Sequence, residues 1–179
     1  MVISSRKELL DYIAANGYTK ELFNEPVEIA QGVKNLNGLF MNLSSFNQEV
    51  RLPQGVEYID YMFSGCTSFN QPMILPDSVK SANFAFENCS SLNCDILLNK
   101  GLYSAYCMFA GCVVLNKVVN VPSSVEWCHN MFYRCKSLTN SSIGGLKNSM
   151  TPKNRVEFLA NEEAYSKRVI VECDEDDED

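Results

Sequence analysis

Histidine, tryptophan and long apolar runs are all scarce in this chain of 179 residues, which has one histidine and one tryptophan. No apolar run approaches the roughly 20 residues that a membrane helix needs. A secretory signal has an apolar stretch after its basic residues. The start of this chain, MVISSRKELL, has no such stretch after Arg6 and Lys7. We therefore expect a chain that neither spans a membrane nor is exported, and that resides in the cytoplasm, or in the host cytoplasm if its source is viral.

Catalytic signatures are missing as well. A cysteine or serine nucleophile with a histidine base would have to use His129, because the chain has no other histidine. The sequence contains no GxSxG motif, no glycine-rich phosphate loop and no helix carrying a set of metal ligands. These absences predict a protein that is not an enzyme, needs no cofactor and holds no metal.

The formal net charge of -7 comes from one end of the chain. Seven of the 22 acidic residues lie within residues 172–179, and the other 15 equal the lysines and arginines in number. The body of the chain is therefore formally neutral and lacks the clustered basic residues of a nucleic-acid groove. We expect residues 172–179 to form a disordered acidic tail, and we expect no direct binding to nucleic acid.

What the sequence does contain is a repeat, because MFSGCTSFNQPMILPDSV returns in similar form every 23 residues. The recurring positions hold a phenylalanine and, in four copies, a cysteine three residues later: Phe40, Phe63, Phe86, Phe109 and Phe132, then Cys66, Cys89, Cys112 and Cys135. One unit of this length cannot bury its apolar side chains alone, so the copies must stack on one another. We predict a β-rich, leucine-rich-repeat-like solenoid of about five repeats over residues 27–140, joined by short parallel strands and capped by helices at both ends.

The repeated pattern resembles a known family. MF-x-x-C-x-x-[LF]-N, followed by an apolar pair, Pro and Val, is similar to the BspA-type leucine-rich repeats and to the related repeats of mycoplasma lipoprotein-associated surface proteins. The pattern covers about 114 of the 179 residues. The resemblance implies a right-handed solenoid that binds proteins or surfaces and has neither a cofactor nor catalytic residues.

The N-terminal segment, residues 1–26, is interpreted as a cap over the first coil. Ser5 and Glu8 are spaced as a capping box, and an apolar stripe follows them until Asn16 and Gly17. This pattern predicts a helix over residues 6–15. Such a helix would cover the edge that the first coil otherwise exposes.

The C-terminal segment, residues 141–171, is interpreted in the same way. Thr151 and Pro152 have the pattern of a helix start, which predicts a helix through RVEFLANEEAYS. Residues 168–173, RVIVEC, alternate only in part between apolar and polar types, but enough to predict a short strand. A helix and a strand are therefore expected to cap the last coil.

The four cysteines in register occupy one place on successive coils, and we interpret them as an inward ladder of small apolar side chains. Leu43 takes that place in the first coil, which favours packing over chemistry. Disulfide bonds, or a metal site including His129, stay open as alternatives, although no CxxC pair supports zinc. Asparagines also recur, at Asn47, Asn70, Asn93 and Asn116, and we expect their amides to turn inward and satisfy backbone groups of the bend.

Positions that differ between copies are free to recognise a partner. Each repeat ends at a Val or a Leu, and we expect side chains after it to point alternately outward and inward. The inward residues are then Ile59, Ala82, Ala105 and Cys128. Two outward ladders result, which read Tyr58, Ser81, Ser104, Trp127 and Asp60, Asn83, Tyr106, His129. Aromatic residues are typical of interface centres, so the partner-binding candidates are Tyr58, Asp60, Tyr106, Trp127 and His129. An ordinary solvated sheet face is the alternative.

Together these features predict a non-enzymatic repeat module that binds another protein through one face of the solenoid. One alternative is a small phage or mobile-element inhibitor whose acidic surface or tail blocks a basic, nucleic-acid-binding target. A second alternative is a fragment of a surface or virion adhesin that recognises a glycan or a host protein. None of the three specifies a particular partner or an oligomeric state.

Overall fold

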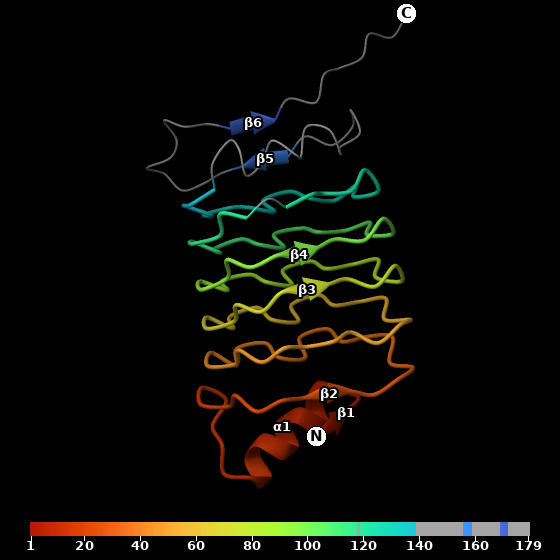
Figure 1. Ribbon diagram of the computed structural model, residues 1–179, viewed down its shortest axis with the longest axis vertical. Coiled ribbons are helices and arrows are strands. Elements are labelled where there is room, and N and C mark those ends of the chain that lie inside the picture. The colour runs from red at the N-terminus through yellow and green to blue at the C-terminus, as the bar shows by residue number, and fades with distance from the viewer. Residues whose placement is uncertain (118, 139–155, 159–168, 172–179) are drawn as a thin grey trace, which may run out of the picture.

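The computed structural model describes residues 1–117 and 119–138, and also two short strands near the C-terminus. From the N-terminal helix onward the chain forms flat coils that stack along the long axis of the molecule (Figure 1). Residues 23 positions apart in sequence are direct neighbours in adjacent coils, as the bonds between Asn47 and Asn24 and between Asn83 and Asp60 illustrate. The stacking that the repeat predicted is therefore the organising feature of the fold.

Regular secondary structure is sparse, because each coil contributes only one or two residues to any ladder. β1 (Val2–Ile3) pairs in parallel with β2 (Glu28–Ile29), and β3 (Met73–Ile74) pairs in parallel with β4 (Ile96–Leu97). A second line of parallel bridges joins the residues at one position of each coil: Asn35, Tyr58, Ser81, Ser104 and Trp127. The predicted short parallel strands are confirmed.

Two columns of stacked phenylalanine rings form the core. In the first column, neighbouring ring centroids are 5.2 to 5.5 Å apart, and the rings are Phe40, Phe63, Phe86, Phe109 and Phe132. In the second column the spacing is 6.2 to 6.4 Å, and the rings are Phe23, Phe46 and Phe69. All of these rings are buried. Stacked aromatic pairs contribute about 0.5–1.5 kcal/mol beyond their buried area, so the columns hold adjacent coils in register.

The four cysteines of the repeat lie inside the stack, where each thiol donates a hydrogen bond to the carbonyl oxygen of a phenylalanine. The Sγ···O distances are 3.0 to 3.1 Å, and the pairs are Cys66 with Phe40, Cys89 with Phe63, Cys112 with Phe86 and Cys135 with Phe109. Burial raises the pKa of Cys66 and of Cys135 to about 12. All cysteines among the described residues are free thiols. Burial and the thiol bonds indicate a packing role.

The asparagine prediction is right about hydrogen bonding and wrong about direction. The Asn47 N–H donates to the Asn24 side-chain oxygen at 2.8 Å, and the same bond recurs at 2.8 to 2.9 Å for Asn70, Asn93 and Asn116. Each accepting oxygen belongs to the preceding coil, and these asparagines are exposed or half-buried. The reason is that the backbone N–H groups of this bend point along the stack, so a neighbouring coil satisfies them without burying the amide.

The repeat contacts begin earlier than the sequence predicted. Phe23 stacks on Phe46, and Asn24 accepts the first bond of the asparagine ladder, although both residues fall within the predicted N-terminal segment of residues 1–26. The sequence prediction missed this coil because the residues before Phe23 lack the strand-like part of the repeat. The stack therefore includes the chain from Phe23 onward.

The predicted N-terminal helix is confirmed as α1 (Arg6–Ala15). The Ser5 hydroxyl accepts the Glu8 N–H at 3.3 Å, and the helix ends at Asn16. The capping box is only half formed, because the Glu8 carboxylate bonds to Ser4 instead of returning to the Ser5 N–H. No helix among the described residues has both the length and the apolar character needed to cross a membrane.

α1 lies against the first coil (Figure 1). Leu9 and Ile13 are buried in the core of the stack. The Arg6 guanidinium donates to three carbonyl oxygens of that coil, those of Gly38, Leu39 at 3.2 Å and Met41 at 2.9 Å. These carbonyls lie at the end of the stack, where no preceding coil covers them, so the helix supplies both apolar cover and a donor.

The predicted C-terminal helix is wrong in the part that the structure describes. β5 (Val156–Phe158) lies within the segment expected to be helical, and it pairs antiparallel with β6 (Val169–Val171). The helix prediction relied on a local start signal, whereas Val-Glu-Phe and Val-Ile-Val favour strands and pair with each other across the intervening residues. β6 confirms the predicted short strand. The rest of this segment and the acidic tail, residues 172–179, lie outside the described residues.

Candidate partner-binding face

The outward ladders lie where the sequence predicted them. The four residues expected to point inward are all buried: Ile59, Ala82, Ala105 and Cys128. On the outward side, Tyr58 is 40% exposed, Trp127 is 52% exposed and Tyr106 is 38% exposed. His129 is exposed and Asp60 is half-buried. We call this surface the outward face.

A ladder of side-chain oxygens runs along the outward face. Asn37 Oδ1 accepts the N–H of Asp60 at 2.8 Å, and Asp60 Oδ1 accepts the N–H of Asn83 at 2.8 Å. Asn83 Oδ1 accepts the N–H of Tyr106 at 2.9 Å. Short Asn and Asp side chains suit this role because they place an oxygen close to the backbone. The ladder thus connects four coils through one side-chain position.

Two serines complete this polar floor. The Ser81 hydroxyl donates to Asp60 Oδ1 at 2.6 Å, and the Ser104 hydroxyl donates to Asn83 Oδ1 at 2.6 Å. Asn83 Nδ2 in turn donates to the Ser81 hydroxyl at 3.0 Å. Asp60 Oδ1 therefore accepts two hydrogen bonds, whereas Asp60 Oδ2 has no partner among the described residues.

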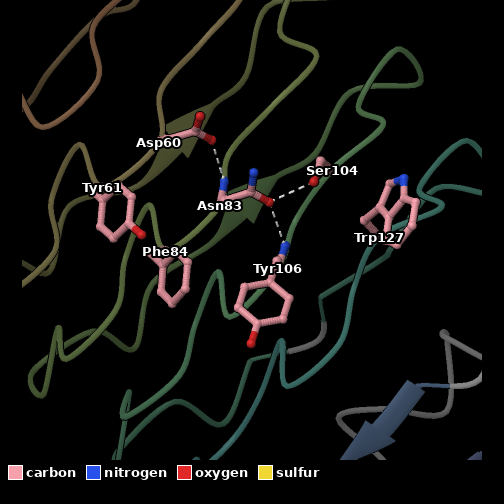
Figure 2. Close-up of a pocket in the computed structure, with 7 residues that line it drawn as sticks. All are labelled: Asp60, Tyr61, Asn83, Phe84, Ser104, Tyr106 and Trp127. Atoms are coloured by element: carbon pink, nitrogen blue, oxygen red, sulfur yellow. Dashed lines mark hydrogen bonds between the residues drawn. The ribbon is translucent and has the colours of Figure 1, made fainter.

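A row of aromatic rings borders one side of the polar floor. The rings of Tyr61 and Phe84 stack with centroids 4.6 Å apart and planes inclined by 7°. The ring of Tyr106 meets Phe84 at 5.1 Å and 66°, in an edge-to-face arrangement. Figure 2 shows the three side chains in sequence beside Asn83. They form a semi-exposed apolar wall, whereas the phenylalanines of the two stacked columns are buried.

Trp127 stands on the opposite side of the floor, beyond Ser104 (Figure 2). Its indole N–H donates to the Tyr103 hydroxyl at 3.0 Å, and its ring centroid lies 6.4 Å from that of His129. Together with the aromatic row, Trp127 borders a recess of about 270 Å³ whose polar lining is Asp60, Asn83 and Ser104. We call this hollow the aromatic recess.

The backbone at two residues of the aromatic row is left-handed. Tyr61 has a φ of 57° and Phe84 a φ of 56°, and Gly38 holds the equivalent position of the first coil with a φ of 64°. Glycine adopts this conformation freely, whereas a bulky L-residue pays about 1–2 kcal/mol for it. Aromatic residues occupy a glycine-like position in two successive coils, and their rings line the recess. Cys107 and Asn130, one and two coils further on, are left-handed as well, with φ of 51° and 55°. The conformation therefore belongs to the repeat, and what Tyr61 and Phe84 add is an aromatic ring at this position.

The aromatic recess is negatively charged. Neither Asp60 nor Glu87 forms an ion pair within the described residues, and no lysine or arginine lines the recess. The pKa of Tyr61 is raised, first by burial and then by the negative charges of Glu87 and Asp60. By contrast, Glu57 is paired with two lysines. The recess therefore carries acidic charge that has no counter-ion among the described residues.

A second hollow, of about 560 Å³, lies along β3 and β4. Its apolar part includes Ile74, which is 71% exposed, and Leu97, which is 54% exposed. Arg51 also lines it and pairs with Glu49 at 3.0 Å. This hollow has no aromatic lining and its one arginine already has a partner, so it lacks the features that distinguish the aromatic recess.

The structure brings most of the predicted site residues together. Asp60, Tyr106 and Trp127 line the aromatic recess, and His129 lies beside Trp127. Tyr58 belongs to the line of parallel bridges but does not line the recess. Among the described residues, no group of three or more His, Cys, Asp or Glu side chains is placed to hold a metal ion.

Tyr61 and Phe84 are the site residues that the sequence prediction missed. The sequence prediction assigned inward and outward side chains by assuming that they alternate along a strand, and it stopped at Asp60 and its equivalents. The next residue has a left-handed backbone, which breaks this alternation. A signal was nonetheless present, because Gly38, Tyr61 and Phe84 are spaced by 23 residues. A glycine that aligns with aromatic residues indicates a special backbone position with an exposed side chain.

Comparisons with known proteins agree with the fold. The sequence model of the BspA type leucine-rich repeat region matches residues 13–151 in six copies. The structure is similar to that of a T. pallidum leucine-rich repeat protein, with 20% sequence identity and a TM-score of 0.53, over 75% of this chain and 73% of that one. A leucine-rich repeat protein from Bacteroides ovatus is similar over 63% of this chain and 35% of its own, with 21% identity and a TM-score of 0.44. No curated protein sequence matches the chain.

Proposed function

The chain belongs to the BspA-type leucine-rich repeat family, and we propose that it is a non-enzymatic module that binds a partner protein through the outward face. Stacked repeat proteins commonly present one extended surface to a partner, because every coil contributes the same position to it. The observation that carries the proposal is the aromatic recess, in which four partly exposed rings surround a polar floor.

The composition of the recess supports protein binding. Tyr and Trp supply large contact areas with little loss of side-chain freedom, and they are enriched at the centres of protein interfaces. Tyr106 and Trp127 remain 38% and 52% exposed, so both keep apolar surface that a partner can cover. The stacked core beneath them supplies a rigid support, which lowers the entropic cost of binding.

The proposal is tested by affinity capture from a lysate of the organism that encodes the chain, with mass spectrometry as the readout. The wild type is compared with a variant that carries Tyr106→Ala and Trp127→Ala. The matched control carries Ile74→Ala and Leu97→Ala, which removes exposed apolar side chains from the second hollow. We expect a specific protein to be lost with the aromatic variant and kept with the control.

Two results would contradict this assignment. Loss of the captured protein only in the Ile74 and Leu97 variant would move the interface to the hollow along β3 and β4. Loss only after deletion of residues 172–179 would make the acidic tail the binding element, as an electrostatic inhibitor requires. Thermal unfolding of each variant, followed by circular dichroism, separates loss of binding from loss of folding.

A further inference from the structure

The charge of the aromatic recess is not needed to build the outward face. Asn37 and Asn83 make the same hydrogen bond to the next coil that Asp60 makes, and they do so without a charge. Asp60 therefore brings a carboxylate where an amide would satisfy the backbone. Its Oδ2 atom has no hydrogen-bond partner among the described residues, so one acceptor remains for a ligand.

No side chain of residues 1–117 or 119–138 places a cation on the rings of the recess. The face of an aromatic ring attracts a cation placed over it within about 6 Å of the ring centroid, and Trp is the most effective partner. Arg134 lies over Tyr133, at 5.1 Å from the ring centroid, but the described residues place no cation on Tyr61, Phe84, Tyr106 or Trp127. The recess thus combines one carboxylate with four rings on which no cation lies in the part of the chain that the structure describes.

We propose that the aromatic recess receives a cationic side chain, arginine or lysine, from a basic segment of a partner protein. The proposal rests on the proposed function, because it specifies the chemistry of the partner at the same face. The cation pairs with the carboxylate of Asp60, and the row of Tyr61, Phe84 and Tyr106 packs against the aliphatic stem (Figure 2). Glu87 adds negative charge nearby without taking part in an ion pair among the described residues.

A neutral sugar fits this recess less well than a cation. Most polar atoms of the floor are already bonded to one another, since Asp60 Oδ1 and Asn83 Oδ1 each accept two hydrogen bonds. A sugar would need several free donors and acceptors as well as an open ring face, yet Tyr61 and Phe84 cover one face of each other. The carboxylate of Asp60, which has no ion-pair partner among the described residues, is the feature that remains, and its charge selects for a positive ligand.

Trp127 gives a direct readout, because it is the only tryptophan of the chain and it lines the recess. Its fluorescence is titrated with a short peptide of alternating arginine and glycine, and with the corresponding lysine peptide. The matched control peptide carries citrulline in place of arginine, which keeps the shape and removes the charge. We expect both basic peptides to change the emission in a saturable manner, and we expect the citrulline peptide to bind at least about tenfold more weakly.

The variant that tests the carboxylate is Asp60→Asn, which retains an acceptor at the position where Asn37 and Asn83 serve the same ladder. Its control is Asp77→Asn, which changes the net charge equally at an exposed residue that does not line the recess. We expect Asp60→Asn to weaken peptide binding about tenfold and Asp77→Asn to weaken it less than about twofold. Equal losses in the two variants would overturn the proposal, because they would show a response to overall charge.

Further outcomes also decide the question. Tight binding of the citrulline peptide, or displacement of the arginine peptide by a neutral oligosaccharide, would overturn the cationic assignment. If the basic peptides fail to bind while cellular capture still depends on Tyr106 and Trp127, the cation inference fails and the proposed function stands. If the peptides bind as expected but capture does not depend on these two residues, the cation site stands and the proposed function fails.

Discussion

The backbone N–H of Asn83 donates to the Asp60 carboxylate at 2.8 Å, and the N–H of Asp60 makes the same bond to Asn37 one coil earlier. Asp60 thus occupies a position that asparagine fills in the neighbouring coils. The bond itself needs an oxygen and no charge. This relationship separates the structural role of residue 60 from its electrostatic role, and substitutions can test the two independently.

The structural role predicts different stabilities for two variants of Asp60. Asp60→Ala removes the acceptor of both the Asn83 N–H and the Ser81 hydroxyl, so we expect the free energy of unfolding to fall by about 1–2 kcal/mol. Asp60→Asn retains the acceptor, and we expect a change within about 0.5 kcal/mol. Urea unfolding followed by circular dichroism measures both values. A loss in Asp60→Asn as large as that in Asp60→Ala would show that the ladder requires the charge.

The two kinds of aromatic position predict different costs of substitution. Phe63 is buried between Phe40 and Phe86, so Phe63→Ala should lower the free energy of unfolding by about 3–5 kcal/mol. Tyr61→Gly loses an exposed stacking contact but relieves a left-handed backbone, so its net change should stay within about 1 kcal/mol. Urea midpoints provide the comparison. A cost above about 2 kcal/mol for Tyr61→Gly would identify its ring as part of the structural core.

The buried thiols predict a loss of stability at alkaline pH. Burial raises the pKa of Cys66 from its ordinary value of 9.0 to about 12, so the folded state keeps a proton that the unfolded state releases. The stabilisation is fully present below pH 9.0 and is lost as pH rises toward 12. For this one thiol the free energy of unfolding falls by up to about 1.4 kcal/mol per pH unit.

The measurement is a series of urea unfolding curves from pH 7 to pH 11 for the wild type and Cys66→Ala. We expect the variant to be less stable at neutral pH, because it loses packing and the bond to Phe40. Above pH 9 its stability should fall less steeply than that of the wild type, since one titrating thiol has been removed. Parallel profiles would contradict the assignment of a raised pKa to the Cys66 thiol. Tyrosine ionisation affects both proteins and cancels in the comparison.

The contacts of Arg6 predict that the N-terminal helix depends on one side chain. Arg6→Ala removes the donor to the carbonyl oxygens of Gly38, Leu39 and Met41, so we expect a loss of about 1–3 kcal/mol. Hydrogen exchange should increase first in α1 and the first coil. Lys7→Ala is the control, because Lys7 forms only an exposed ion pair with Asp11, and we expect it to change the stability far less than Arg6→Ala does. Faster exchange throughout the stack in Arg6→Ala would contradict a local role.

Much of the fold was predictable because the repeat has no insertions. Knowing that Phe40 and Phe63 are equivalent is enough to infer that they are neighbours, and the structure places their rings 5.2 Å apart. The direction of the asparagine amides was predicted wrongly. The 23-residue spacing shows that these asparagines hold the same position in each coil, but it does not tell whether their hydrogen-bond partner lies in the same coil or in the next one. The helix expected at Val156–Phe158 failed for a related reason, since its strand partner β6 is not adjacent in sequence.

The sequence by itself determined which residues share a place on successive coils, because a constant step of 23 residues makes every residue the neighbour of its equivalent. It therefore determined the buried columns and the outward position of Asp60, Tyr106 and Trp127. Only the tertiary structure decided that Tyr61 and Phe84 join them. A left-handed backbone breaks the alternation of a strand, so the direction of those two rings depends on contacts between coils. The absence of a counter-ion for Asp60 among the described residues also follows from the positions of charges in three dimensions.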